Sequence, residues 1–339
     1  MLRALGAQPV VLAVTDAAHE QDRWRLGDAD IRLAAARGPA QLAYAPDLPV
    51  VLSDAKLDLL HLLGVWQYPT HAAGRWADET GRPLIISPHG MFDPWITGRN
   101  AWKKQAARLL WERRAWHRAA AFHALTAAEA ADIERESPGA RVAVVPNAAP
   151  AASPPRDRTP PPHLLYLGRI HEKKNIAALI AAWRSLRGEL PADATLTIAG
   201  WGDDEGIAML EHAMERADPS IQFVGTAFGA QKAALFDVSR FLVLPSLSEG
   251  LPMAILEAWA SGTPTIQSDA CNLPEGFATG AAIRCGTDRD AIADAIRTAM
   301  SIDDAQWLTK SAAARELAAS PFSQASIALH WEEIYGALL

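Results

Sequence analysis

The 339-residue chain is 50% hydrophobic and has a formal net charge of −7. That length and composition allow about two globular domains with sizeable cores, and the acidic balance argues against a general nucleic-acid-binding protein. The two cysteines, Cys271 and Cys285, are too few for a disulfide framework, so we expect buried free thiols. The chain shows neither a membrane-spanning apolar run nor a secretory signal pattern, which leads us to expect a soluble cytoplasmic protein.

Continuous apolar runs alternate with helical patterns through the first half of the chain. Runs of this kind are typical of parallel strands that are buried on both faces. They predict strands at residues 9–15, 57–65, 83–87, 121–126 and 142–146. The segment 148–162 then contains six prolines, and it predicts a semi-rigid linker because proline suits neither a helix interior nor a central strand.

The same alternation returns after the prolines. It predicts further strands at residues 163–169, 195–200, 221–225, 241–246 and 264–268. The pattern indicates an α/β fold of two doubly wound parallel-sheet domains that face each other across a cleft. The expected organisation is a first domain at 1–150, a linker at 151–162, a second domain at 163–320, and a C-terminal helix at 321–339 that crosses back to the first. Ligands of such sheets bind beyond the carboxyl ends of the strands, so the residues that follow each strand carry the functional information.

Basic residues follow the first predicted strand of the second half, where the sequence reads RIHEKKN. Arg169, Lys173 and Lys174 lie at the strand end and at the entry to a helical pattern. Free N–H groups at a helix start, an arginine fork and a lysine point charge together suit a phosphate or diphosphate. A solvated basic turn explains these residues equally well when they are taken alone.

Glycines follow the strand at 195–200 in the motif GWGDDEG. Gly200, Gly202 and Gly206 nearly match the dinucleotide fingerprint G-x-G-x-x-G, but the third glycine comes one position late and the strand opens neither domain. The motif therefore favours a tight strand-to-helix turn over a site for a cofactor pyrophosphate. Glycine at this point also allows the backbone to lie close to another ligand.

The segment SEGLPMAILEA, residues 248–258, holds two glutamates eight positions apart. Pro252 suits the first turn of a helix that stops at Gly262. This prediction places Glu249 in the loop before the helix and Glu257 inside it.

Two readings of these glutamates remain open. The N–H groups of Gly250 and Leu251 lie at the positive end of the predicted helix and favour an anionic ligand. Glu257 could then accept hydrogen bonds from a vicinal diol such as a ribose, and Glu249 could accept them from a sugar. Alternatively, Glu249 only complements the helix dipole and Glu257 is a solvated helix residue, which is the better reading for either glutamate alone.

His89 follows the predicted strand at 83–87, in the sequence PHGMFDPW. A single histidine is more often structural than chemical, but a loop at the carboxyl end of a strand favours a functional role. His61, Trp66 and Asp93 are weaker candidates for the same region.

The segment 99–118 combines seven Lys or Arg residues and one Glu with interleaved apolar residues, among them Trp102, Leu109, Leu110 and Trp116. This pattern is typical of an amphipathic helix that lies on an anionic membrane surface. A core-packed helix with a solvated basic face explains the segment equally well.

No metal site is expected. The pairs Asp28 with Asp30 and Asp288 with Asp290 have the D-x-D form, but neither follows a clear strand. Asp288 instead predicts a helix cap before the sequence AIADAIRTAM.

Five motifs, in their order and spacing along the chain, resemble those of glycosyltransferase family 4, whose members are retaining enzymes of the GT-B fold. From the N-terminal side they read SPHGMFDPW, GRIHEKKN, IAGWGDD, FVGT and LPSLSEGLPMAILEAWASGTPTI. The resemblance extends from about residue 8 to the closing helix SIALHWEEIYGALL. One such motif is a weak signal, but five together are specific.

The resemblance implies a role for each matching residue. Glu249 and Glu257 match the family pattern E-x7-E, which implies contacts to the donor sugar and to the ribose of a sugar nucleotide. Arg169 and Lys174 match residues that hold the diphosphate and stabilise it as it leaves, and His89 matches a histidine near the donor sugar. The residues expected to bind the sugar nucleotide are Gly200, Gly202, Val224, Gly225, Thr226, Gly250, Leu251, Pro252 and Glu257.

The start of the chain departs from the family pattern. Family members normally open with a strand, a glycine-rich loop and a helix, whereas this sequence starts inside that helix, at LRALGAQ. We expect that a central strand and the loop lining the acceptor side, about 20 to 30 residues, either lie upstream or are lacking. A chain extended upstream is predicted to melt at a higher temperature and to turn over faster.

These observations predict an enzyme that moves a hexose from a nucleotide-diphosphate sugar to a saccharide or lipid-linked acceptor, with retention, in surface-polysaccharide or lipopolysaccharide synthesis. No metal or other cofactor is expected, and nucleic acid is not expected as a partner. Two other classes stay open: an NAD(P)-dependent oxidoreductase that uses GWGDDEG, and a non-catalytic two-domain sugar-binding protein. The segment 99–118 adds the expectation of peripheral contact with the inner face of an anionic membrane.

Overall fold

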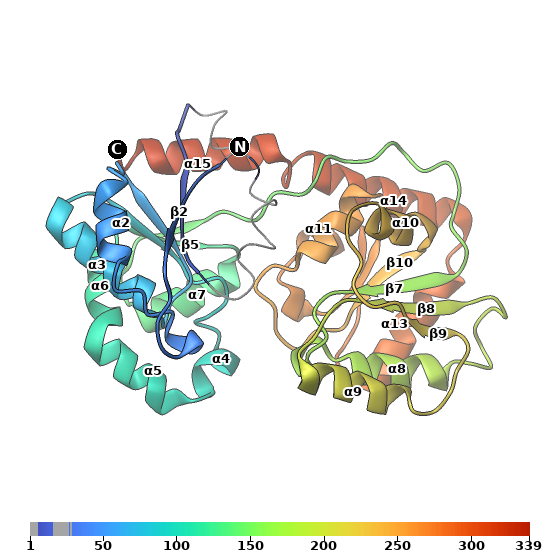
Figure 1. Cartoon of the computed structure of the whole chain (residues 1–339). Coiled ribbons are helices and arrows are strands. Elements are labelled where there is room, and N and C mark those ends of the chain that lie inside the picture. Colours follow the sequence, from blue (N-terminus) through green and yellow to red (C-terminus); the bar gives the residue numbers. More distant parts are fainter. Residues whose placement is uncertain (1–5, 16–26, 28) are drawn as a thin grey trace. The chain divides into compact units, whose positions relative to one another are not determined.

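A computed structural model describes residues 6–15, 27 and 29–339. The chain divides into two compact units, and Figure 1 shows both. Unit 1 comprises residues 1–146 and 328–339, and unit 2 comprises residues 147–327. Asp28 and most of the helix expected at the very start of the chain lie outside the described residues. Among the described residues, every helix is too short or too polar to span a lipid bilayer.

Parallel strands form two sheets in unit 1: β1 pairs with β2, and a second sheet has the order β3-β4-β5-β6. The strands are β1 (Val10–Val14), β2 (Asp30–Ala34), β3 (Leu60–Leu63), β4 (Leu84–Ser87), β5 (Ala121–Ala124) and β6 (Val142–Val144). The five strands expected in this half are confirmed, and β4 and β5 are buried throughout. Strand β2 was not predicted, because Asp30 and Arg32 interrupt its apolar pattern.

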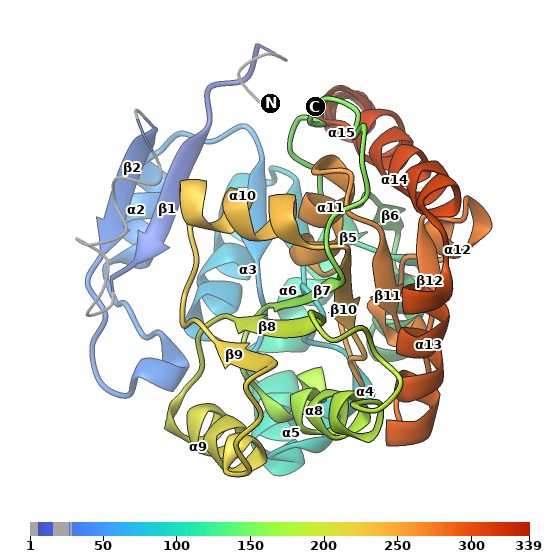
Figure 2. The same cartoon turned by 90° about the vertical axis from the view of Figure 1, so that its right-hand side faces the viewer.

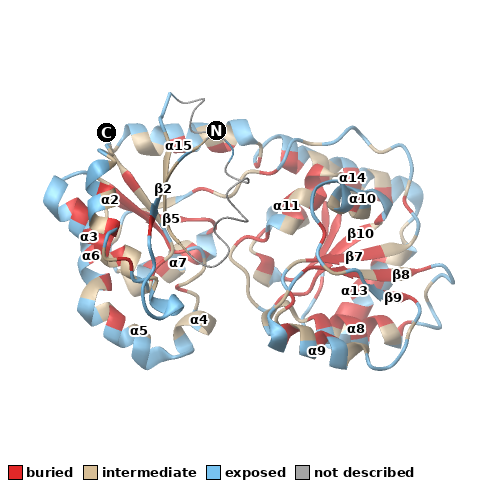
Figure 3. Cartoon of the chain, viewed as in Figure 1, coloured by how far each residue is buried: buried red, intermediate tan, exposed pale blue. Residues whose placement is uncertain are grey.

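Helices cover the four-stranded sheet of unit 1. Helix α3 contacts β3, β4, α2 and α6, whereas α7 contacts β5 and β6. The helical elements are η3 (Ala40–Leu42), α2 (Leu48–Asp54), α3 (Tyr68–Thr80), α4 (Pro94–Gly98), α5 (Ala101–Ala107), η4 (Arg108–Glu112), α6 (Arg113–Arg118) and α7 (Ala127–Glu136). Figure 3 shows the buried residues of unit 1 concentrated in its strands and in the inner faces of these helices.

The basic segment 99–118 is not one regular helix. It consists of α5, the π-helical turn η4 and α6. The wide turn leaves Leu109 and Leu110 exposed while it directs Glu112 into the interior. A π-helical turn inside a helix often marks a functional position.

Unit 2 contains one parallel sheet with the order β12-β11-β10-β7-β8-β9. The strands are β7 (His163–Leu167), β8 (Thr195–Ala199), β9 (Ile221–Phe223), β10 (Phe241–Leu244), β11 (Thr265–Gln267) and β12 (Ala282–Arg284). All five expected strands are confirmed. Strand β12 was missed because its three residues at the sheet edge carry too short an apolar run.

Helices lie on both faces of this sheet, as a doubly wound fold requires. Figures 1 and 2 show α8, α9 and α13 on one face, with α10, α11 and α14 on the other. The helical elements of unit 2 are η5 (Glu172–Lys174), α8 (Ile176–Ser185), α9 (Asp204–Met214), α10 (Gly229–Val238), α11 (Met253–Ala260), η6 (Asp269–Cys271), α12 (Glu275–Ala278), α13 (Arg289–Ser301) and α14 (Asp304–Ala319). The last helix, α15 (Gln324–Gly336), begins in unit 2 and ends in unit 1.

The proline-rich segment, predicted as a semi-rigid linker, is tied to unit 2 by hydrogen bonds. The Arg156 guanidinium donates to the carbonyl oxygens of Phe236, Asp237 and Ser261, which end α10 and α11. The N–H of Ser153 donates to the carbonyl of Ala260 at 2.7 Å. Unit 2 accordingly starts at residue 147, and at the other end of the chain residues 328–339, most of α15, group with unit 1.

Candidate active site

The carboxyl edge of the unit 2 sheet has a switch point between β7 and β10. From β7 the chain runs outward through β8 and β9, and it then returns to β10 on the other side of β7. In doubly wound folds, ligands bind beyond the carboxyl ends of the strands at such a switch point. The loops after β7 and β10 touch, because the N–H of Leu247 donates to the carbonyl of Lys173 at 2.7 Å.

Lys174 and Glu249 meet at this switch point. The Lys174 Nζ lies 2.5 Å from Oε1 of Glu249, and the Ser246 hydroxyl donates to the same oxygen at 2.7 Å. The side chains are only 12% and 6% exposed. Two predicted residues that are 75 positions apart thus form one largely buried ion pair, in which removal of either partner leaves an uncompensated charge.

The loop that carries Glu249 is held from behind by Asn272. Its side-chain amide donates to the carbonyl oxygens of Glu249 and Gly250 at 2.7 and 3.1 Å. Leu251 is buried, and Pro252 is the N-cap residue of α11 rather than part of its first turn. The backbone of Gly250 and Leu251 therefore lies at the positive end of α11, as the sequence predicts.

Arg169 extends toward the glycine-containing loop after β8. Its guanidinium pairs with Asp203 at 2.8 Å and lies 5.2 Å from the centre of the Trp201 ring. Asp203 also caps α9 by accepting from the N–H of Gly206 at 2.9 Å. The arginine is thus pre-oriented, yet 43% of its side chain remains exposed and accessible to an anion.

The glycines of GWGDDEG are required by close backbone packing. A Cβ at Gly200 would lie 1.8 Å from the carbonyl oxygen of Gly168, and a Cβ at Gly206 would lie 2.3 Å from that of Ile170. Gly202 forms an isolated parallel bridge with Ile170. The backbone after β7 therefore runs against the loop after β8, which accounts for the three glycines as a tight turn.

The segment expected to read the nucleotide base lies next to that loop. The N–H of Gly200 donates to the carbonyl of Gly225 at 2.8 Å, and the N–H of Val224 donates to Ile198 at 3.0 Å. Val224 and Thr226 are exposed beside it. The fold thus brings two of the motifs together through backbone hydrogen bonds.

Glu257 lies on α11 and pairs with Lys232 of α10 at 2.7 Å. The two side chains are 20% and 30% exposed, so Glu257 is not the freely solvated helix residue of the simpler reading. Sequence reasoning missed Lys232, which is 25 positions away from its partner and belongs to no motif.

His89 follows β4 in unit 1, as predicted, and its backbone has a φ of +52°. The Glu129 carboxylate fixes its turn by accepting from the N–H of Gly90 at 2.6 Å and from that of Leu125 at 2.8 Å. Partial desolvation lowers the pKa of His89, and the charge of Glu129 opposes that shift. Thr126 caps α7 by accepting from the N–H of Glu129 at 3.2 Å, and the Glu129 side chain ties two loops together.

Glu112 is a fully buried carboxylate near the loop after β3. It accepts hydrogen bonds from the N–H of Trp66 at 2.7 Å and from the indole nitrogens of Trp111 and Trp116 at 3.0 and 2.9 Å. Burial raises the pKa of Glu112 to about 7, although these bonds and one from Thr70 lower it. The hydrogen bonds to Glu112 hold Trp66, whose backbone φ is +73°, in place at the carboxyl edge of the sheet.

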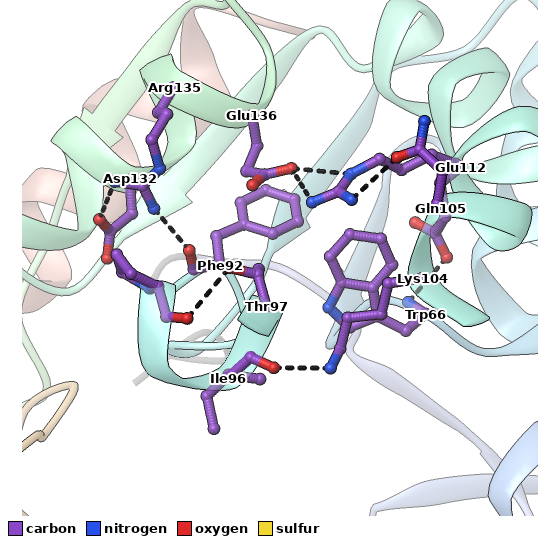
Figure 4. A network of polar contacts seen from close by, with 12 residues as sticks. Trp66, Phe92, Ile96, Thr97, Lys104, Gln105, Glu112, Asp132, Arg135 and Glu136 are labelled. Carbon is purple, nitrogen blue, oxygen red and sulfur yellow. Dashed lines mark hydrogen bonds and ion pairs between the residues drawn. The ribbon is translucent and has the colours of Figure 1, made fainter. Parts of the chain in front are cut away.

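Figure 4 shows how the segment after His89 is held by α5 and α7. Lys104 donates to the carbonyl of Ile96 at 2.6 Å, and Arg135 donates to that of Phe92 at 2.7 Å. Arg108 pairs with Glu136 at 2.6 Å, with side chains that are 16% and 11% exposed. Residues 90–98 are therefore held by two cations, Lys104 of the basic segment and Arg135 of α7.

Asp288 caps α13, as the sequence predicts, by accepting from the N–H groups of Asp290 and Ala291 at 3.1 and 2.9 Å. Within the described ranges, no three His, Cys, Asp or Glu side chains gather as metal ligands would.

Family models match nearly the whole chain. The model described as glycosyl transferases group 1 matches residues 161–301, and the model described as glycosyl transferase 4-like domain matches residues 1–148. The chain belongs to the group 1 glycosyltransferases. The resemblance that the motifs indicate is thereby confirmed.

Curated relatives share the family at moderate identity. The chain is 33% identical over 202 residues to a glycogen synthase of Mycobacterium tuberculosis, covering 58% of this chain and 48% of the relative. It is 32% identical over 150 residues to O-antigen chain mannosyltransferase B of Escherichia coli, covering 43% of this chain and 38% of that protein. This glycosyltransferase chain thus spans about half or less of the length of these relatives.

Solved structures show the GT-B fold. HepE of Anabaena, solved in complex with UDP and glucose, has a TM-score of 0.78 at 17% identity, covering 97% of this chain and 92% of HepE. Sucrose-phosphate synthase of Thermosynechococcus elongatus has a TM-score of 0.71 at 19% identity, covering 98% and 99%. The prediction of two doubly wound, Rossmann-like domains is therefore confirmed for this glycosyltransferase.

Proposed function

We propose that the protein transfers a hexose from a nucleoside-diphosphate sugar to a saccharide or lipid-linked acceptor, with retention of anomeric configuration. The observation that carries the proposal is the Lys174–Glu249 pair at the switch point of unit 2. It places a cation and an anion where a doubly wound sheet binds its ligand. The family and the complexes of HepE with UDP-glucose support a sugar nucleotide as the donor.

The leaving diphosphate accumulates negative charge as the glycosidic bond breaks. Lys174 and the accessible Arg169 would stabilise that charge, together with the positive end of α11 at Gly250 and Leu251. Cations that are already in place lower the barrier without reorganisation, so the proposal requires no metal ion. Glu249 would accept a hydrogen bond from the donor sugar at Oε2, because Lys174 and Ser246 both bind Oε1.

The nucleoside would lie along the loops after β8, β9 and β10. Glu257 would accept from the ribose hydroxyl groups, and the backbone at residues 224–226 would contact the base. Gly200 and Gly202 would line the same path with backbone only, because their packing excludes a Cβ. His89 of unit 1 would act on the donor sugar, and a front-face route, in which the leaving phosphate helps to deprotonate the acceptor, would give retention.

The acceptor and the biological setting are part of the proposal. Relatives include enzymes named for O-antigen and amylovoran synthesis, which supports a role in surface-polysaccharide or lipopolysaccharide assembly. Such acceptors are built on lipid carriers at the inner face of a membrane, so we place the enzyme in the cytoplasm at that surface.

The basic segment 99–118 supplies the proposed membrane contact. Trp102, Leu109 and Leu110 are 72%, 67% and 72% exposed, and the cations Lys103 and Arg113 lie beside them in sequence and are also exposed. Exposed apolar side chains flanked by cations match the surface of an anionic bilayer, where each cation contributes about 1 kcal/mol.

Sedimentation with vesicles tests the membrane contact. Native protein should pellet with phosphatidylglycerol vesicles and not with phosphatidylcholine vesicles. The double variant Lys103→Glu/Arg113→Glu should lose the binding, whereas charge reversal at Arg216 and Arg289 of unit 2 should retain it. Equal binding by both double variants would contradict the role of this segment.

The transfer itself is tested by product analysis. The full chain is incubated with UDP-glucose, GDP-mannose or ADP-glucose and a set of saccharide and lipid-linked acceptors, and the products are analysed by NMR spectroscopy. We expect release of one nucleoside diphosphate for each glycoside formed, with the α-configuration of the donor retained. A β-glycoside as product would contradict retention, and the absence of diphosphate release with every pair would contradict the transferase proposal.

A further inference from the structure

Four polar side chains of unit 1 form a continuous chain of hydrogen bonds that ends on a carbonyl group. The Tyr335 hydroxyl lies 2.9 Å from Nδ1 of His61, and Nε2 of His61 lies 2.6 Å from the Ser87 hydroxyl. That hydroxyl lies 2.7 Å from Nδ1 of His123, and Nε2 of His123 lies 2.7 Å from the carbonyl oxygen of Val145. We call these four side chains the relay.

The carbonyl end determines the direction of every bond. A carbonyl oxygen only accepts, so Nε2 of His123 carries a proton and Nδ1 of the neutral ring accepts from Ser87. Ser87 has a single proton and therefore accepts from Nε2–H of His61. Nδ1 of His61 is then left to accept from the Tyr335 hydroxyl. Both histidines are consequently neutral Nε2–H tautomers, and Tyr335 is the donor that starts the relay.

The relay joins the C-terminal helix to the ends of three strands. Tyr335 lies on α15, His61 on β3, Ser87 at the end of β4 and His123 on β5. Trp331 of α15 packs against both imidazoles, with ring centres 5.0 Å from His61 and 4.7 Å from His123. Water has little access there, because Ser87, His123 and Trp331 are 0%, 5% and 7% exposed.

The groups that face the relay also favour neutral imidazoles. Burial lowers the pKa of His61 to about 3 and that of His123 to about 4, with His89 adding to both shifts. The charge of the Glu129 carboxylate acts on His89, whose ring centre lies 6.0 Å from that of His123. Burial also raises the pKa of the Tyr335 hydroxyl to about 12, so the hydroxyl keeps the proton that it donates.

We propose that Tyr335 is a positioning residue: its hydroxyl completes the relay whose direction the Val145 carbonyl sets, and in this way it holds both imidazoles and the turn that carries His89 in place. The connection is short, because Ser87 accepts from one imidazole, donates to the other, and precedes His89 by two residues. The inference rests on the proposed function of His89 in transfer, but its structural part can be measured without any substrate.

Nitrogen-15 NMR spectroscopy of the histidine rings in the full chain tests the direction of the relay. We expect proton-bearing Nε2 and unprotonated Nδ1 at both His61 and His123 at neutral pH. Tyr335→Phe removes the first donor and retains the ring that stacks on Trp331 at 5.1 Å. In this variant we expect the ring signals of His89 to shift. A proton on Nδ1 of His123, or unchanged His89 signals in Tyr335→Phe, would overturn the proposal.

Kinetics separate positioning from packing. Tyr335→Phe should lower kcat about tenfold while leaving the Kd for the nucleoside diphosphate unchanged, because the donor site lies on unit 2. Loss of the donor to Nδ1 lets His61 take up a proton more easily, so the acid limb of kcat should move upward by about one pH unit. The matched variant Tyr44→Phe, which removes an exposed hydroxyl of the same unit, should change neither quantity.

The two kinds of failure are distinguishable. Wild-type protein that transfers sugar, together with a Tyr335→Phe variant of identical kcat and pH profile, would reject the positioning role and leave the proposed function intact. Wild-type protein that releases no diphosphate with any donor would reject the proposed function. The NMR measurements of the ring tautomers and of the His89 signals would still show whether Tyr335 holds the relay and His89 in place.

Discussion

The two units share one parallel α/β plan, yet they hold their candidate functional residues in different ways. Unit 2 presents charges in pairs at the carboxyl edge of its sheet, such as Lys174 with Glu249 and Lys232 with Glu257. Unit 1 has the largely buried Arg108–Glu136 pair, but it holds the loops after β3 and β4 mainly with buried groups that face no opposite charge, such as Glu112 and the relay histidines. The difference fits two tasks: stabilising a diphosphate requires charge, whereas positioning one side chain requires a rigid and neutral frame.

The largest expected effect is on the stability of unit 1. Glu112→Ala leaves the N–H of Trp66 and two indole N–H groups without their acceptor, so the free energy of unfolding should fall by about 3–5 kcal/mol. Urea unfolding measures this loss. The control Glu332→Ala, at an exposed position, should change the free energy of unfolding by no more than about 0.5 kcal/mol. Equal losses in both variants would show that the hydrogen bonds of Glu112 do not stabilise unit 1.

A charge removed from unit 2 should instead affect turnover. Lys174→Met should lower kcat by about 10²–10³-fold, because it removes a cation that faces the leaving diphosphate. It should also reduce stability, since Glu249 stays buried without a partner. The double variant Lys174→Met/Glu249→Gln should recover the stability but not the turnover. Recovery of both would contradict a role in catalysis.

Sequence predicted unit 2 better than unit 1 for a physical reason. The strands of both units could be predicted because their apolar runs are continuous, and the residues of the proposed donor site fall within short motifs after strands. The supporting residues of unit 1 lack such a local signal: Glu112 is 46 positions from Trp66, and Glu129 is 39 positions from Gly90. Their partners come together only when the loops fold, so no spacing in the sequence indicates them.

The same limit explains the smaller discrepancies. The single amphipathic helix expected at 99–118 contains a π-helical turn because Glu112 has to face the interior. The proline-rich segment packs on unit 2 because the Arg156 guanidinium donates to carbonyl oxygens at the C-terminal ends of two helices there. His61 was recognised only as a weak candidate and His123 not at all, since a histidine in an apolar strand is usually structural.

Acid should act in opposite directions on two groups of buried side chains in unit 1, the relay histidines and Glu112. The pKa values of His61 and His123 are lowered in the folded state, so their contribution to stability is lost as pH falls below 6.5. The pKa of Glu112 is raised, so its contribution grows over the same range. From pH 7 to 5.5 the wild type should lose roughly 1 kcal/mol and Glu112→Gln roughly 2.5 kcal/mol. Urea midpoints at the two pH values measure both losses, and a gain of stability in acid for Glu112→Gln would contradict these assignments.

A smaller effect is expected at Glu257. Glu257→Ala should weaken nucleoside-diphosphate binding about tenfold by removing the ribose acceptor, with little change in kcat. Lys232→Ala frees Glu257 from its ion pair and should retain the binding. Calorimetric titration compares the nucleotide affinities of the two variants. A Glu257→Ala variant with native affinity would show that this glutamate is a helix residue without a role in binding.

The central claim is that unit 2 binds a nucleoside diphosphate at the switch point of its sheet. A thermal-shift panel of UDP, GDP, ADP, CMP and NAD on the full chain tests it most directly, because a ligand at 100 times its Kd stabilises the folded state by about 2.7 kcal/mol. We predict that one nucleoside diphosphate raises the melting temperature, that CMP and NAD do not, and that Lys174→Met/Glu249→Gln abolishes the shift. A shift with NAD alone, or no shift with any diphosphate, would contradict the account.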